Sequence, residues 1–169
     1  MTADRQWICR KDFNDATIAT LADCNSRHHG NIFFGVNPRS NNTGTKAAIK
    51  SVTCLWADID DCTFDAFKGK VNELALPKPT IAVNSGNGIH AYWVFHQPIS
   101  IDSKATLNRI ENTVGRLLEA LGGKKMKGTQ DVSRILRIPH AQFMNVKNAR
   151  NGQAEKTVEI VHMEATLKY

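Results

Sequence analysis

The stretch at residues 80–95, TIAVNSGNGIHAYWVF, contains two apolar runs separated by the turn sequence NSGNG. β-Branched and aromatic residues dominate both runs, and the turn glycines can adopt the positive φ angles that tight turns need. The pattern therefore predicts an antiparallel hairpin with strands at 80–83 and 89–95.

The sequence on either side of this hairpin contains further strand and helix patterns. The predicted strands are 32–36, 49–60 and 157–163, and the predicted helices are 14–25, 64–74 and a long helix from a cap at Asp102 or Ser103 to Leu121. Strands mixed with helices around a central hairpin indicate an α+β fold. We expect a mixed or antiparallel sheet with helices on one side.

Length and composition restrict the classes of protein to which the chain can belong. With 169 residues, 41% of them hydrophobic and 22% charged, the sequence predicts one globular domain over 1–169 and excludes a disordered chain. No apolar run approaches the roughly 18 residues that cross a bilayer, so we expect no membrane partner. The N-terminus does not resemble a secretory signal, and the four cysteines lack metal-ligand spacing. We therefore expect a cytoplasmic protein with free thiols.

The net charge of +6 is unevenly distributed along the chain. Residues 104–150 contain ten Lys and Arg against three Asp and Glu, whereas residues 1–103 are balanced. Such clustering is typical of proteins that bind polyanions, because phosphate neutralisation releases condensed counterions. A solvated basic face is the alternative. The candidate nucleic-acid contacts are Lys124, Lys125, Lys127, Lys147 and Arg150.

The first motif is WADID at residues 56–60, at the end of a predicted strand. Because side chains alternate along a strand, Asp58 and Asp60 should share one face of the sheet, where like charges repel. A divalent cation between them would remove that repulsion, and oxygen ligands suit Mg²⁺ or Mn²⁺. The alternative is a strand end that enters an acidic loop.

The second motif is NSGNGIH at residues 84–90. Gly86 and Gly88 would allow a ligand to approach the backbone closely, and the hairpin would direct Ser85 and His90 toward that ligand. A phosphate could accept hydrogen bonds from the turn N–H groups and from His90. The alternative is a tight turn beside a surface histidine.

The third motif is DVSRILRIP at residues 131–139, inside the basic segment. Asp131 could complete a three-carboxylate metal site, and Arg134 and Arg137 could clamp a triphosphate. The alternative is an ion-paired helix or strand.

In this order, the three motifs resemble those of the archaeo-eukaryotic primase superfamily. They are most similar to the primase-polymerase domains of phage, plasmid and other mobile-element replication proteins. The run IFFGVNPR at 32–39 also resembles the upstream strand of that subgroup, so the resemblance covers roughly residues 31–147. It implies an RRM-like catalytic core with flanking helices, which could be the core of a longer replication protein.

The resemblance implies a DNA primase and DNA polymerase that synthesises and extends primers on single-stranded DNA. Asp58, Asp60 and Asp131 match the family acids that hold two Mg²⁺ or Mn²⁺ ions, and His90 matches the histidine at the phosphates of the incoming NTP or dNTP. The other residues expected at the nucleotide are Arg39, Ser85, Gly86, Gly88, Arg134 and Arg137. A template, a primer, a helicase domain or protein, and a prokaryotic, phage or plasmid context are also implied.

The chain departs from the subgroup after the third motif. The subgroup continues from R-x-P with G-T-x-N-x-K, whereas HAQFMNVK follows Pro139 in this chain. The glycine is missing, and the pair Asn145 and Lys147 lies two positions late. The resemblance therefore carries no role over to Asn145 or to Lys147.

Two other functions compete with this interpretation. A metal-dependent nuclease or rolling-circle nickase is suggested by the histidine pair at 28–29, although the histidine–hydrophobic–histidine spacing and an obvious tyrosine nucleophile are absent. A non-catalytic binder of single-stranded nucleic acid would stack bases on aromatic side chains. The candidate stacking residues are Phe33, Phe34, Tyr92 and Trp93.

Overall fold

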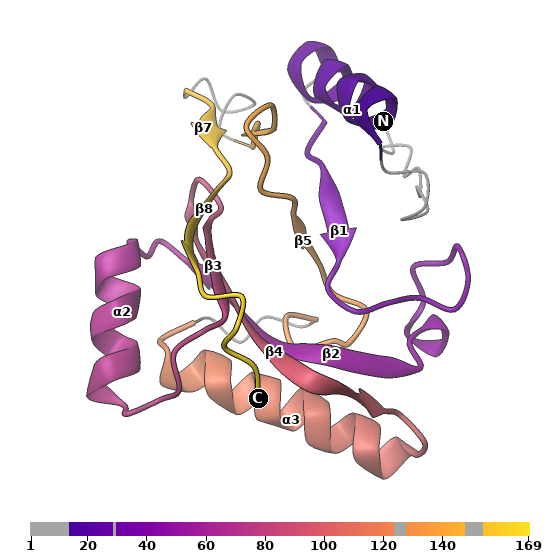
Figure 1. The fold of residues 1–169 in the computed structure, drawn as a ribbon, viewed down its shortest axis with the longest axis vertical. Coiled ribbons are helices and arrows are strands. Elements are labelled where there is room, and N and C mark those ends of the chain that lie inside the picture. Colours follow the sequence, from indigo (N-terminus) through magenta and orange to yellow (C-terminus); the bar gives the residue numbers. More distant parts are fainter. Residues whose placement is uncertain (1–13, 29, 124–127, 148–153) are drawn as a thin grey trace.

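A four-stranded antiparallel sheet forms the centre of the protein (Figure 1). The structure is a computed structural model that describes residues 14–28, 30–123, 128–147 and 154–169. The strand order is β2-β4-β3-β8, with bounds Ser51–Asp60, Gly88–Ser100, Ile81–Asn84 and Glu159–Met163. Two helices pack on one face of this sheet, and a short two-stranded pair lies on the opposite side. The predicted α+β fold is confirmed.

The central hairpin, β3–β4, forms around the glycine turn that the sequence predicts. The N–H of Ser85 donates to the carbonyl oxygen of Gly88 at 2.8 Å, and Gly86 between them has a φ of 88°. Only glycine adopts that angle without steric cost. The turn therefore depends on this glycine.

The register between β2 and β4 brings the first two motifs together. Asp58 lies opposite His90, and Asp60 lies opposite Gly88. Residues directly opposite in an antiparallel pair project to the same face of the sheet. The two acids and the histidine therefore share one face.

The described residues form three α-helices, α1 at Asp15–His28, α2 at Phe64–Glu73 and α3 at Lys104–Ala120, of which α2 and α3 pack on the four-stranded sheet. The side chain of Ser103 caps α3 by accepting a hydrogen bond from the N–H of Thr106, as the sequence predicts, and Gly122 follows the helix with a φ of 79°. Apolar side chains of α2 and α3 join those of the sheet in one core. The buried helix residues in that core are Phe67, Val71, Ile110, Val114 and Leu118.

In the short pair β1–β5, the sequence predicts the first strand but does not identify its partner. β1 spans Phe33–Gly35 and pairs antiparallel with β5, Ile135–Arg137, so that Phe33 lies opposite Arg137. The third motif is thus a turn followed by a three-residue strand. Three residues are too few for a periodic pattern, so the sequence alone does not decide between a helix and a strand for this motif.

The C-terminal strand also differs from its prediction. The predicted strand at 157–163 divides into β7, Lys156–Thr157, and β8, because β7 pairs with β6, Met144–Asn145, and β8 pairs with β3.

In the part of the chain that the structure describes, no helix is long and apolar enough to cross a membrane.

We expect Gly88→Ala to destabilise the fold, because a Cβ at this position would lie 2.0 Å from the carbonyl oxygen of Ile59. Strands β2 and β4 would have to separate, at a cost of about 1–3 kcal/mol in the free energy of unfolding. Urea denaturation measures this change.

Gly69→Ala is the matched control, because Gly69 lies in α2 and a Cβ there has no neighbour within 4 Å. This variant should be about 0.5–1 kcal/mol more stable than the wild type, because alanine favours a helix. Equal free energies of unfolding for Gly88→Ala and the wild type would show that the described strand register is wrong.

Candidate active site

Residues from the three sequence motifs meet at the carboxylate of Asp58 on β2. Its Oδ1 lies 3.4 Å from Nε2 of His90 on β4, and its Oδ2 accepts a hydrogen bond from Nη2 of Arg134, in the turn before β5. The side chain of Asp58 is only 15% exposed, so water screens this ion pair weakly. We call Asp58, His90 and Arg134 the Asp58 cluster.

His90 is the most buried member of the cluster, with 2% exposure. Burial lowers the pKa of His90 to about 4, although the charge of Asp58 opposes this shift, while Arg137 and Arg134 reinforce it. The imidazole is therefore neutral at pH 7 and offers one donor and one acceptor. Its Nδ1 has no hydrogen-bond partner among the described residues. His90 can thus bind a ligand through a hydrogen bond rather than through an ionic interaction.

A second arginine, Arg137 on β5, lies beside the cluster. Its Nε donates to Oδ1 of Asn31 at 3.2 Å, and its guanidinium carbon lies 5.6 Å from the centre of the Phe33 ring. Burial lowers the pKa of Arg137, and the negative charges of Asp58 and Asp60 oppose that shift. Arg137 remains charged at neutral pH, because the pKa of a guanidinium starts far above 7.

Asp58 and Asp60 fit a divalent cation by position and by chemistry. They project from one face of β2, Asp60 is exposed at the end of that strand, and both offer carboxylate oxygens. Mg²⁺ commonly binds one or two carboxylates and completes its ligands with water and substrate phosphates. Within the described ranges, however, no group of three or more His, Cys, Asp or Glu side chains is placed to hold a metal ion.

The structure does not bring the predicted third acid, Asp131, to the other two. Its Oδ1 accepts hydrogen bonds from the N–H and the hydroxyl of Ser133 at 2.8 and 2.7 Å. Its Oδ2 lies 2.9 Å from Nζ of Lys46, which is also 2.7 Å from Oε1 of Glu111 on α3. Burial raises the pKa of Asp131, but the Ser133 hydrogen bonds and the Lys46 charge outweigh burial and lower it. Local partners thus hold this carboxylate in the turn that presents Arg134.

Arg39 is predicted at the nucleotide, and in the structure its guanidinium donates hydrogen bonds to two backbone carbonyl oxygens. Its Nη2 donates to the carbonyl oxygen of Ser133 at 2.8 Å, and its Nη1 donates to that of Asn37 at 3.4 Å. The guanidinium lies against Gly35, where a Cβ would come within 1.5 Å of Nη1. Arg39 therefore joins the end of β1 to the turn that carries Arg134.

Sequence reasoning missed the role of Asn145, a fully buried residue on β6. Its Nδ2 donates to the carbonyl oxygen of Ser85 at 2.8 Å, and its Oδ1 accepts from the N–H of Lys147 at 3.1 Å. The Ser85 hydroxyl itself donates within the turn, to the carbonyl oxygen of Gly88 at 3.1 Å. The turn before His90 is therefore held from outside by Asn145. The displaced N-x-K pattern was the one sequence signal for this residue.

The remaining predicted contacts have mixed outcomes. Lys147 is exposed beside Asn145, whereas Lys124, Lys125, Lys127 and Arg150 lie outside the described residues. Of the four candidate stacking aromatics, Phe33 is exposed, Phe34 is half-buried, and Tyr92 and Trp93 are buried. In the histidine pair, His28 ends α1 and the next residue is not described. Of these four candidates, only Phe33 therefore presents an exposed ring for base stacking.

Comparison with known proteins agrees with this arrangement at the level of the fold. No family model and no curated protein matches the chain. Among solved structures, the chain is similar to the AEP domain (PP-N190) of the cyanophage S-2L primase-polymerase, with a TM-score of 0.62 and 22% sequence identity. The match covers 95% of this chain and 80% of that chain. The protein therefore has a fold of the primase-polymerase AEP type.

Proposed function

We propose that the chain is a metal-dependent nucleotidyltransferase, a DNA primase-polymerase that joins nucleotides on a single-stranded DNA template. The observation that carries this proposal is the Asp58 cluster. Three sequence motifs that are far apart in the chain contribute one residue each to it. The AEP-type fold supports the same reaction class.

The charges of the site suit a metal–nucleotide complex. Asp58 and Asp60 are matched by Arg134 and Arg137, so the four side chains together carry no net charge. A metal-bound triphosphate brings both signs of charge. The two carboxylates can then face the cation while the two guanidiniums face phosphate oxygens, and no charge is left unpaired.

Each residue would have a distinct role in nucleotidyl transfer. Asp58 and Asp60 would bind Mg²⁺ or Mn²⁺, which when bound lowers the pKa of an attacking hydroxyl and neutralises a leaving pyrophosphate. Arg134 and Arg137 would stabilise the negative charge that develops on the phosphate oxygens. His90, which is neutral, would donate a hydrogen bond to the same phosphates.

Asp131 would act on the reaction through Arg134. It holds the turn of residues 131–134 by its bonds to Ser133 and Lys46, and the backbone N–H of Arg134 donates to the Asp131 carbonyl oxygen at 2.8 Å. We therefore place Asp131 as a positioning residue. Exposed Lys147 and the other basic residues of 104–150 would contact template and primer phosphates.

Asp58→Asn and Asp60→Asn should each lower primer extension at least about a hundredfold, because each removes a carboxylate from the cation. A gel of products from a primed single-stranded template with Mn²⁺ measures this. Asp65→Asn is the matched control, because the Asp65 side chain is 91% exposed on α2 and should change nothing. Full extension by either of the first two variants would refute the proposal, and shortening of the strand would indicate a nuclease.

Asp131→Asn tests the positioning role against the metal-ligand role. Extension should fall about ten- to a hundredfold, because Arg134 loses its alignment, while the Kd for Mn²⁺ stays at the wild-type value. Asp60→Asn, measured in parallel by calorimetry, should bind Mn²⁺ more weakly. If Asp131→Asn loses Mn²⁺ as Asp60→Asn does, Asp131 is a metal ligand and the positioning role is wrong.

Asn145→Ala should raise the KM for the nucleotide about tenfold and change kcat less. The substitution leaves the Ser85 carbonyl oxygen without its buried donor, so the turn before His90 loosens. Steady-state extension kinetics separate the two constants. Asn72→Ala, at an exposed position of α2, is the control. A fall in kcat with an unchanged KM would contradict a role for Asn145 at the nucleotide.

A further inference from the structure

Glu111 on α3 is a partly buried acid that has no part in the three sequence motifs. It precedes Val114 of the core by three positions, so it lies on the side of α3 that packs on the protein. Its side chain is 17% exposed. Its Oε1 lies 2.7 Å from Nζ of Lys46 and accepts a hydrogen bond from the backbone N–H of Val132 at 3.2 Å. One carboxylate oxygen thus joins α3 to two distant segments of the chain.

Lys46 lies between two carboxylates, those of Glu111 and Asp131, and its Nζ is 2.9 Å from Oδ2 of Asp131. Burial lowers the pKa of Lys46, but its bonds to the two carboxylates outweigh burial and raise it, so the side chain is charged at neutral pH. The three residues come from the 3₁₀ helix Lys46–Ala48, from α3 and from the third motif. We call Lys46, Glu111 and Asp131 the Lys46 bridge.

The turn of residues 131–134 is also bonded through its backbone to the β1 side and to β2. The carbonyl oxygen of Val132 accepts a hydrogen bond from Nδ2 of Asn37 at 3.0 Å, and Oδ1 of Asn37 accepts one from the N–H of Thr53 on β2 at 3.2 Å. Val132 and Asn37 are buried, so water does not compete for the bond between them. The turn therefore has one set of polar contacts to β1 and β2 and another, through the Lys46 bridge, to α3.

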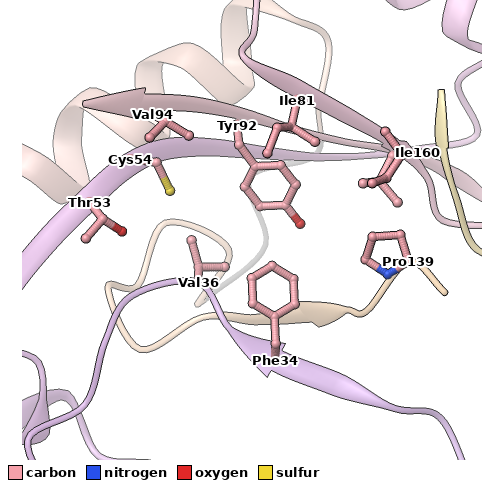
Figure 2. Close-up of a pocket in the computed structure, with 10 residues that line it drawn as sticks. Phe34, Val36, Thr53, Cys54, Ile81, Tyr92, Val94, Pro139 and Ile160 are labelled. Atoms are coloured by element: carbon pink, nitrogen blue, oxygen red, sulfur yellow. The ribbon is translucent and has the colours of Figure 1, made fainter. Parts of the chain in front are cut away.

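Close packing does not fix the β1–β5 side of the protein against the sheet beside this turn. An apolar cavity of about 250 Å³ lies between them, with Phe34 and Val36 on one side and Tyr92 on the other (Figure 2). The backbone N–H of Val36 donates to the carbonyl oxygen of Arg134 at 3.0 Å, so the cavity borders the segment that carries Arg134. The lining of a cavity lacks the contacts that resist displacement. The position of the turn therefore depends on its polar contacts.

We propose that Glu111 is a positioning residue for the reaction and that it acts through Arg134. Glu111 holds the turn by the Val132 N–H and by the Lys46 bridge, and the turn sets the point from which the Arg134 side chain reaches Asp58. A displaced turn would carry the guanidinium away from the phosphates that it would bind. The inference rests on the proposed function, since it requires phosphates at Arg134.

The test is a double-mutant cycle between Glu111 and Arg134, measured by calorimetry as the Kd of inorganic tripolyphosphate with Mn²⁺. Glu111→Ala removes the acceptor of the Val132 N–H and should weaken tripolyphosphate binding about tenfold. Arg134→Gln keeps an N–H donor for Asp58 and removes the guanidinium. In that background, Glu111→Ala should change the Kd less than about twofold, because the group through which Glu111 acts is gone.

Glu111→Gln is the conservative variant, because its amide oxygen can still accept the hydrogen bond from Val132 while the ion pair with Lys46 is lost. It should fold even if Glu111→Ala does not, and it should weaken tripolyphosphate binding about two- to threefold, only when Arg134 is present. Glu119→Gln is the matched control, because it removes the same charge from an exposed position of the same helix. It should bind tripolyphosphate as the wild type does.

Two outcomes would overturn the inference. A wild-type Kd for both Glu111 variants would show that Glu111 does not hold the site. Equal weakening with and without the Arg134 guanidinium would show that Glu111 stabilises the protein as a whole and does not act through Arg134. If the wild type itself does not bind tripolyphosphate with Mn²⁺, the proposed function fails at the Asp58 cluster. That result differs from a wild type that binds and Glu111 variants that bind equally well.

Discussion

The carboxylate of Asp58 connects the two parts of this fold. One of its oxygens faces His90 inside the four-stranded sheet, and the other bonds Arg134 in the turn that leads to β5. Removing one partner of such a partly buried pair leaves a charge without compensation, which costs more than the pair contributes net. The pair therefore acts mainly as a constraint on geometry. It holds the β1–β5 side of the protein against the face of the sheet that carries Asp58 and His90.

This constraint also explains how two aspartates can project from one strand face. Positions i and i+2 of a strand are about 7 Å apart, and two unit charges at that distance repel by about 2 kcal/mol at an effective dielectric constant of 20. In this structure, Arg134 and Arg137 balance Asp58 and Asp60. Under the proposed function, binding of a metal–nucleotide complex would therefore be an exchange of partners within a neutral site. Arg134 and Arg137 belong to the basic segment 104–150, and under the proposed function the other basic residues of that segment would contact the longer polyanion.

The fold could be predicted where a periodic pattern of apolar residues extends over a long run. The site could be predicted where the alternation of side chains along a strand decides the direction of each side chain. The runs that became β2 and β4 are long, and their alternation placed Asp58 and Asp60 on one face. The environment of Asp131 could not be predicted, because its partner Lys46 lies in a short 3₁₀ helix far away in the sequence, with no pattern that links the two. The role of Asn145 could not be predicted either, because β6 has only two residues and two residues show no pattern.

The polar residues of the motifs separate into two groups by how well their atoms are satisfied. Asp131, Ser85 and Asn145 bond to the protein itself, and these bonds hold turns in place. By contrast, Nδ1 of His90, Nε of Arg134 and the hydroxyl of Tyr92 are buried without a partner among the described residues. Native structures rarely leave buried polar atoms unpaired, so atoms of this kind mark positions where a ligand completes the bonding. His90 and Tyr92 project from the same face of β4, and Arg134 bonds the acid beside His90, so these unpaired atoms lie on one side of the sheet.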